Sequence, residues 1–215
     1  MPRGFTKKRD ARVAAILDAA QLLFSEKGYE ATTVADILEA VGIGKGTFYH
    51  YFDSKDEVLE AVVERLTTNL VERANALANT AGLDAHSKMV QLIALISIAQ
   101  TPEGGIIEDL HRPENARLRR RSLVETIRQV APVMARVVEQ GVAEGVYSTP
   151  NPLETVEFLL VGISAILDEE LFAWTPQEFA GRAREVVRIT ELALGARPDA
   201  FAFLADRPPT PWQRR

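Results

Sequence analysis

Residues 33–55 contain two short helical patterns separated by a glycine turn, and a further helical pattern begins directly after them. Thr33 with Asp36 three residues later resembles a capping box, which predicts a helix that begins near Thr33 and ends before Gly42. A second helix is expected over residues 45–52. Two short helices joined in this way form a helix-turn-helix, a motif that places its second helix in the major groove of DNA.

The helix expected at residues 45–52 has an apolar side and a polar side. At about 100° per residue, Phe48 and Phe52 point the same way, toward a small core made with neighbouring helices. The other side presents a cation, a bare backbone, an aromatic ring and an imidazole, which are groups that meet phosphates and base edges. These residues are Lys45, Gly46, Tyr49 and His50, while Thr33, Thr47 and Lys55 stand where a side chain reaches backbone phosphates.

Two other interpretations of this segment are open. Residues 42–47 read G-I-G-K-G-T, but a nucleotide-binding phosphate loop requires G-x-x-x-x-G-K-[ST] after an apolar strand, and neither condition is met. The second interpretation is an ordinary solvated helix surface. Exposed aromatic residues on a short helix favour a surface that binds a partner.

Helical periodicity continues through the rest of the chain and predicts an all-α fold. Pro132 lies inside one expected helix and should kink or divide it. The tail after Gly195 is rich in Pro and Arg and is expected to fray. The other expected helices cover residues 8–27, 54–77, 83–100, 103–111, 114–144, 153–174 and 176–194.

Composition and charge limit the classes of protein to which this chain can belong. The net charge is −5, yet residues 1–55 carry 8 Lys and Arg against 7 Asp and Glu, and the remainder carries 17 against 23. The basic first twelve residues suit an arm near phosphates, with a solvated, disordered tail as the alternative. The longest apolar run, at 158–167, is far shorter than the roughly 20 residues of a membrane span. No apolar secretory segment follows the basic N-terminus, so we expect a cytoplasmic protein.

No catalytic or metal-binding pattern stands out. The chain has three histidines and no cysteine, and no nucleophile motif frames a serine, so we do not expect an enzyme. The carboxylates at 168–170 fan around a helix instead of converging. His111 lies near Glu108, Asp109 and Glu114, a set for which solvation of a helix end is a simpler explanation than a divalent cation. We expect no metal and no cofactor.

Residues 10–62, with LFSEKGYEATTVADILEAVGIGKGTFYHYFDSKDEVLEAV at their centre, resemble the N-terminal domain of the TetR family, the tetracycline-repressor-like bacterial transcription factors. The resemblance covers about a quarter of the chain. It implies that GKGTFYHYF contains the recognition helix. By the same resemblance the groove face is Lys45, Gly46, Thr47, Tyr49 and His50, and the phosphate anchors are Thr33, Tyr51 and Lys55.

The resemblance also implies a domain plan. It comprises an arm and DNA-binding domain at residues 1–54, a helical ligand-binding and dimerisation domain at 55–195, and a flexible tail at 196–215. Such a protein is a ligand-responsive regulator, most often a repressor, that binds a near-palindromic operator as a homodimer and is released by a small-molecule effector. A helical protein-interaction scaffold without sequence-specific DNA binding is the alternative.

Two sets of apolar residues follow from this plan. The helix expected from residue 153 is apolar on almost every side, so it must be covered all round, either by its own core or partly by a second subunit. The resemblance favours a subunit interface at Val156, Leu159, Leu160, Ile163, Ile166, Phe179, Ala183, Val186, Val187, Thr190 and Leu194. The helices that line the ligand pocket in the family carry Leu92, Ile96, Ile106, Leu110, Val130, Met134, Val138, Phe158 and Leu171 here, although core packing explains each of these as well.

Overall fold

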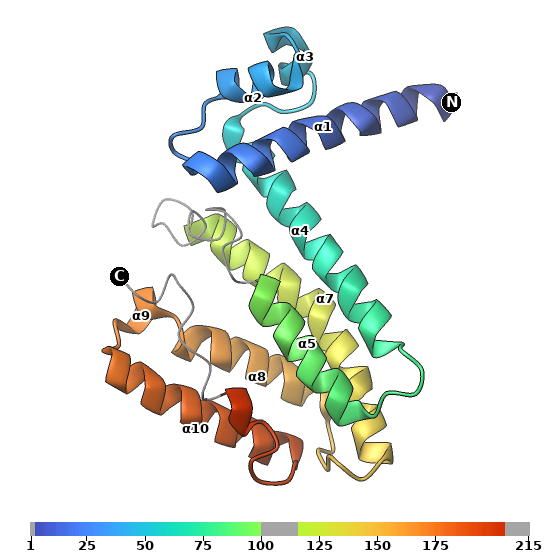
Figure 1. The fold of residues 1–215 in the computed structure, drawn as a ribbon, viewed down its shortest axis with the longest axis vertical. Coiled ribbons are helices and arrows are strands. Elements are labelled where there is room, and N and C mark those ends of the chain that lie inside the picture. Colours follow the sequence, from blue (N-terminus) through green and yellow to red (C-terminus); the bar gives the residue numbers. More distant parts are fainter. Residues whose placement is uncertain (1–2, 100–115, 205–215) are drawn as a thin grey trace. The chain divides into compact units, whose positions relative to one another are not determined.

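The computed structural model describes residues 3–99 and 116–204, and every regular element in these ranges is helical (Figure 1). The predicted all-α class is therefore confirmed. The described residues form two compact units, one of residues 3–68 with 116–122 and the other of residues 69–99 with 123–204. Within these ranges, no helix combines the length and the hydropathy needed to cross a bilayer.

The N-terminal unit contains α1 (Arg3–Lys27), α2 (Val34–Val41), α3 (Lys45–Tyr49) and the first half of α4 (Lys55–Ala78). Its core is built from large side chains that are fully buried. Leu118, near the start of α7 (Ala116–Ala143), also packs against this core. The buried residues include Ile16, Ala20, Phe24, Ile37, Phe48, Val58, Leu59 and Val62.

Local sequence explains where α2 begins and ends. The Thr33 hydroxyl accepts a hydrogen bond from the Asp36 backbone N–H, and the Asp36 carboxylate accepts one from the Thr33 N–H, so the predicted capping box is confirmed. Gly42 ends the helix in the left-handed region at φ 68°, where a residue without a Cβ meets no steric penalty.

Two helix boundaries in this unit differ from the expectation. α1 begins at Arg3 instead of near Lys8, so the helix includes part of the basic arm. α3 ends at Tyr49 instead of Phe52, because the Tyr51 N–H donates to the Phe48 carbonyl across three residues and turns the chain.

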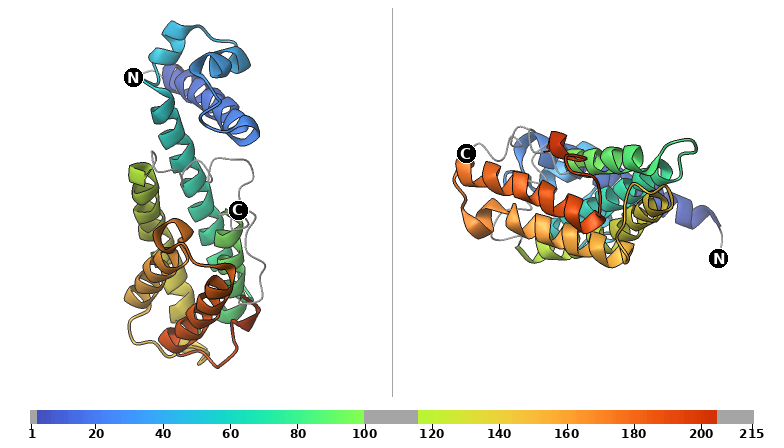
Figure 2. Two further views of the ribbon diagram at one scale, coloured as in Figure 1. Left: turned by 90° about the vertical axis from the view of Figure 1, so that its left-hand side faces the viewer. Right: turned by 90° about the horizontal axis from the view of Figure 1, so that it is seen from below.

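The C-terminal unit contains the rest of α4 and α7 together with α5 (Ala85–Ala99), α8 (Pro152–Ile166), α9 (Glu169–Phe172) and α10 (Pro176–Leu194). α8 and α10 pack side by side, as two views of the ribbon show (Figures 1 and 2). A single apolar core joins these helices. Its fully buried members include Met89, Leu92, Val130 and Val138.

α7 continues unbroken through Pro132, so this helix is not divided there, and the alternative expectation of a kink stays a prediction. Proline removes one backbone N–H donor from the helix interior, which usually costs about 3 kcal/mol. Buried neighbours on both sides hold this part of α7 in the core, and the Arg136 guanidinium donates to the Pro132 carbonyl at 3.3 Å.

The single helix expected at residues 153–174 is also wrong, because α8 ends at Ile166 and the short α9 follows. The Asp168 carboxylate accepts a hydrogen bond from the Leu171 backbone N–H, a local bond that competes with continuation of α8. Trp174 then folds back and donates its indole N–H to the Ile166 carbonyl at 2.8 Å. α10 begins and ends as expected, with a capping box at Thr175 and Gly195 as its left-handed C-cap.

Residues 196–204, which follow α10, are packed, contrary to the expectation of a frayed tail over this part, and the rest of the expected tail lies outside the described residues. Phe201 is fully buried against the ring of Tyr147, at a centroid distance of 6.5 Å. The buried Glu191 carboxylate accepts hydrogen bonds from the backbone N–H groups of Asp199 and Phe201. The short η2 helix (Ala202–Leu204) follows. The expected helix at 103–111, with the His111 cluster and the pocket candidates Ile106 and Leu110, lies outside the described residues.

The two phenylalanines of this segment provide a matched test. Phe201→Ala should lower the free energy of unfolding of the C-terminal unit by about 3–5 kcal/mol, because it removes a fully buried aromatic side chain. Phe203→Ala, at a side chain that is 46% exposed, should change it far less. Urea denaturation followed by circular dichroism measures both, and equal effects of the two substitutions would contradict the packed arrangement.

Candidate DNA-binding surface

α3 presents the predicted groove residues on one exposed side. Lys45, Gly46, Thr47, Tyr49 and His50 are all exposed, and the Tyr49 side chain is 52% exposed. Phe48 lies on the opposite side and is fully buried. The five predicted residues are therefore brought together on one surface.

Gly46 has no structural neighbour that would exclude a side chain. No heavy atom outside its own helix lies within 4 Å of the position that a Cβ would occupy. Its backbone is also outside the left-handed region, since its φ is not positive. The fold of the unit therefore does not require glycine at this position.

The first turn of α2 carries a small charged cluster. The Lys27 ammonium lies 2.8 Å from the Asp36 carboxylate, and Thr33 contributes a backbone and a side-chain hydrogen bond to the same carboxylate. The bond from Lys27, followed by those from Thr33, holds the pKa of Asp36 far below its ordinary value. The Thr33 hydroxyl, predicted as a phosphate anchor, is exposed but already donates to Asp36.

The other two predicted anchors lie in different surroundings. Tyr51 is half-buried, packs against the core of the unit and contacts the His50 ring edge to face at 5.0 Å. Lys55 is half-buried, and its ammonium donates to the backbone carbonyls of Tyr29 and Thr32 at 2.7 and 2.9 Å. Nothing in the sequence pattern predicted this internal engagement of Lys55.

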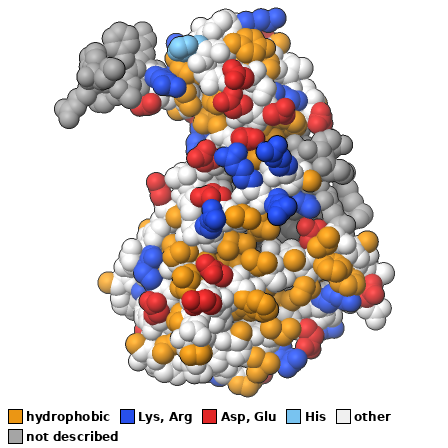
Figure 3. Space-filling model, turned by 180° about the vertical axis from the view of Figure 1, so that it is seen from behind, with side chains coloured by type: hydrophobic (Ala, Val, Ile, Leu, Met, Phe, Trp, Pro, Cys, Tyr) orange, Lys and Arg blue, Asp and Glu red, His pale blue; other side chains and the backbone are white. Residues whose placement is uncertain are grey.

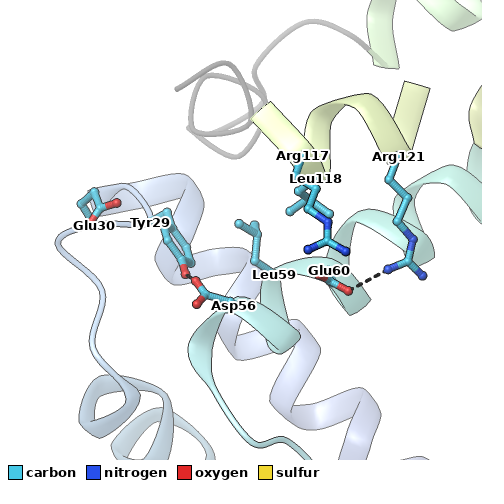
Figure 4. A pocket seen from close by; sticks show the side chains of 8 residues that line it. All are labelled: Tyr29, Glu30, Asp56, Leu59, Glu60, Arg117, Leu118 and Arg121. Atoms are coloured by element: carbon cyan, nitrogen blue, oxygen red, sulfur yellow. Dashed lines mark hydrogen bonds and ion pairs between the residues drawn. The ribbon is translucent and has the colours of Figure 1, made fainter. Parts of the chain in front are cut away.

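A cavity of about 520 Å³ opens beside the first turns of α4, within the N-terminal unit. Figure 4 shows the Tyr29 hydroxyl directed at the Asp56 carboxylate, to which it donates, and Arg121 reaching Glu60. Arg121 and Glu60 form an ion pair at 3.0 Å between two exposed side chains. The walls of the cavity combine charged side chains of both signs with the apolar side chains of Leu59 and Leu118.

The predicted ligand-pocket residues separate into two groups. Leu92, Val130, Met134 and Val138 are buried together in the core of the C-terminal unit, and Ile96 packs against them. Phe158 and Leu171 are 73% and 63% exposed among the described residues, unlike the buried members of the set. Their assignment to the pocket stays a prediction.

The residues of the predicted dimer interface differ in burial. Val156, Leu159 and Leu194 are buried in the core of their own unit and expose little surface. Ile166 is exposed, and the remaining members are half-buried. These are Leu160, Ile163, Phe179, Ala183, Val186, Val187 and Thr190.

The exposed apolar surface of α8 and α10 is carried by residues that the prediction missed. They are Phe158 and Val161 on α8 with Ile189 and Leu192 on α10, each between 44% and 73% exposed. Figure 3 shows hydrophobic side chains gathered over much of the visible face of the C-terminal unit. Because α8 is apolar all round, its sequence alone did not indicate which side faces the core.

Comparison with family models identifies the two parts of the chain. A model described as bacterial regulatory proteins of the tetR family matches residues 16–62. A second model, described as a tetracyclin repressor-like C-terminal domain, matches residues 101–187. The first match contains α2, α3 and the start of α4, where the exposed groove residues lie.

Similar proteins include the HTH-type transcriptional repressor KstR2 of Rhodococcus jostii (strain RHA1), which is 34% identical over 92 residues, or 43% of this chain and 45% of KstR2. The uncharacterized HTH-type transcriptional regulator YfiR of Bacillus subtilis (strain 168) is 27% identical over 181 residues, which cover 80% of this chain and 85% of YfiR. The match to KstR2 thus spans less than half the length of that relative.

Solved structures with the same fold include RolR in complex with resorcinol, with a TM-score of 0.64 and 19% identity over 94% of this chain and 97% of RolR. A transcriptional regulator of the TetR/AcrR family from Thermobifida fusca has a TM-score of 0.55 and 28% identity over 86% of this chain and 97% of that one. The fold of both units is therefore that of known helical regulators.

Proposed function

The chain belongs to the TetR family of bacterial transcriptional regulators, and we propose that it is a ligand-responsive repressor that binds a near-palindromic operator as a homodimer. The observation that carries this proposal is the exposed surface at α3, while Phe48 of the same helix is buried in the core. The exposed residues are Lys45, Gly46, Thr47, Tyr49 and His50. Its partner is double-stranded DNA, so the protein acts in the cytoplasm. Neither catalysis nor a cofactor is part of the proposal.

Each residue type on this side of α3 fits a specific kind of DNA contact. Lys45 offers an ammonium to phosphates or to guanine, and Thr47 and His50 offer hydrogen bonds. The exposed Tyr49 ring provides a donor and a flat apolar surface. Gly46 allows the helix backbone to approach the groove closely.

The exposed apolar side chains of α8 and α10 support homodimerisation. Phe158, Val161, Ile189 and Leu192 are large, and they gather on two helices that pack against each other. A contiguous apolar surface of this kind is typical of a protein interface. Two subunits joined there would present two recognition helices, and a separation of about 34–36 Å would place them in successive major grooves.

The effector in this proposal is a small, partly apolar molecule bound in the C-terminal unit, near Leu92, Ile96, Val130, Met134 and Val138. Such a ligand lowers operator affinity by the difference between its affinities for the two subunit arrangements, typically about 1–3 kcal/mol. Operator affinity measured with and without each candidate molecule identifies the effector, and equal affinities eliminate that candidate.

The primary experiment is selection from random duplex DNA at about 150 mM salt, followed by sequencing. Enrichment of an inverted repeat is the expected result. If only weak, salt-sensitive binding without sequence enrichment remains, the proposed operator recognition is wrong and a protein-binding scaffold becomes the better explanation.

Tyr49→Ala should weaken binding to the selected operator by about 1–3 kcal/mol, because it removes a large exposed contact surface without disturbing the core. Leu22→Ala is a matched control, since Leu22 is a similarly exposed side chain of the same unit, on α1. Fluorescence anisotropy with labelled operator measures both. If the Tyr49 variant binds the operator with the affinity of the parent, Tyr49 does not contact the DNA.

Gly46→Ala should change stability and binding in opposite directions. The added methyl group meets open space and replaces a flexible residue inside a helix, so the free energy of unfolding should rise by about 0.5–1 kcal/mol. Operator affinity should fall because the methyl group holds the backbone away from the groove. Thermal melting and anisotropy test the two effects separately, and unchanged affinity would show that α3 does not approach DNA through Gly46.

Leu192→Asp should convert the dimer to monomer, because it places a charge on an apolar side chain that is 67% exposed on α10. Val142→Asp is the control, at an exposed apolar residue of α7 that lies on neither α8 nor α10. Sedimentation velocity distinguishes the two species. A dimer that persists in the Leu192 variant would place the interface elsewhere.

A further inference from the structure

Lys55, the first residue of α4, is held from three directions within the N-terminal unit. Its ammonium donates to the Tyr29 carbonyl at 2.7 Å and to the Thr32 carbonyl at 2.9 Å. It also lies over the face of the Tyr29 ring, 3.9 Å from the centroid. An ammonium has three N–H donors, so two of them are committed to carbonyls and the aromatic face occupies a further side.

Tyr29, which Lys55 contacts, is held in place by its own packing. Its side chain is buried, and its ring packs edge to face against Phe24 at 5.3 Å. Its hydroxyl donates to the carboxylate of Asp56, the residue that follows Lys55 (Figure 4). Two consecutive residues of α4 therefore hold one tyrosine, Lys55 at the ring face and backbone and Asp56 at the hydroxyl.

The two carbonyls belong to the connection between α1 and α2, directly before the residue that caps α2. Thr32 is itself fully buried, and its hydroxyl donates to the Gly28 carbonyl at 2.8 Å while its N–H donates to the Tyr29 carbonyl at 3.1 Å. Thr33 then caps α2. A shift of Lys55 would thus be transmitted to the first residue of the helix-turn-helix.

We propose that Lys55 is a positioning residue for DNA recognition: it clamps the α1–α2 connection to the first turn of α4 and so fixes the orientation of α2 and α3, and it does not hold a DNA phosphate. This inference rests on the proposed operator binding. With two of its three N–H donors on these carbonyls and the Tyr29 ring on a further side, the ammonium has at most one donor left for a phosphate. The role that the family resemblance implies for Lys55 is therefore revised.

The salt dependence of binding separates the two roles. A lysine that contacts a phosphate releases a counterion, so its loss lowers the slope of log K against log salt by about 0.9. A positioning lysine contributes no such counterion. Its loss misorients α3, which weakens operator binding but leaves non-specific binding by the remaining cations nearly unchanged.

The experiment compares Lys55→Met with Lys45→Met, the same substitution at the exposed lysine of α3. Anisotropy is measured with the selected operator and with a scrambled duplex across a salt series, well below the melting temperature of each variant. For Lys55→Met we expect a parent-like slope, a loss of about tenfold or more in the ratio of operator to scrambled affinity, and a lower melting temperature. For Lys45→Met we expect a slope lower by about 0.9 and an unchanged melting temperature.

Lys55→Gln serves if the methionine variant does not fold, since the amide keeps N–H donors for the carbonyls but carries no charge. It should retain the parent slope and recover part of the operator preference. A slope lowered by about 0.9 in either Lys55 variant, with operator and scrambled affinities reduced alike, would overturn the inference. Parent-like affinity, slope and melting temperature in both variants would overturn it as well.

Failure of the proposed function would be recognised separately. If the parent protein shows no preference for any selected duplex, operator recognition fails whatever the variants do. The clamp is then judged by melting alone, where a parent-like temperature for both Lys55 variants contradicts it.

Discussion

The position of α3 depends on one buried aromatic ring. The helix has five residues, far fewer than the roughly 12–15 at which an isolated helix becomes marginally stable, so tertiary packing must hold it. Phe48 supplies that packing from a fully buried position in a core shared with Phe24 and Ile37. The four exposed residues of α3, with His50 at its C-cap, take their direction from this ring, and the clamp at Lys55 fixes the neighbouring connection on which α2 and α3 are built.

Those parts of the fold that local chemistry specifies were predictable from sequence. The capping boxes at Thr33 and Thr175 and the left-handed glycines at 42 and 195 set the bounds of α2 and α10, and the 100° rotation per residue separated Phe48 from Tyr49. Each of these signals involves residues close together in the chain. The buried and exposed residues of α3 were predictable for the same reason, because helical rotation relates residues close together in the chain.

The remaining features depend on contacts between distant residues or on a choice between two equally apolar faces. The Lys55 ammonium meets carbonyls 23 and 26 residues away, and Phe201 packs against the rings of His86 on α5 and Tyr147 before α8. On α8, both Leu159 and Phe158 are large and apolar, yet the first is buried and the second is 73% exposed. Hydrophobicity alone does not distinguish them, because the helix is covered by its own core on one side only.

The distribution of charge restricts how this protein can attract DNA. Residues 56–215 carry 17 basic against 23 acidic side chains, a net negative charge that repels a polyanion, while residues 1–55 carry 8 basic against 7 acidic ones. Of the eight cations there, Lys27 is paired with Asp36, and Lys55 is committed to two carbonyls. Under the proposed function, Lys45, which is exposed on α3, is the candidate for a phosphate contact. With so few cations, affinity has to come largely from the fit of the exposed side of α3 to base edges, which explains why its orientation is fixed so firmly from within.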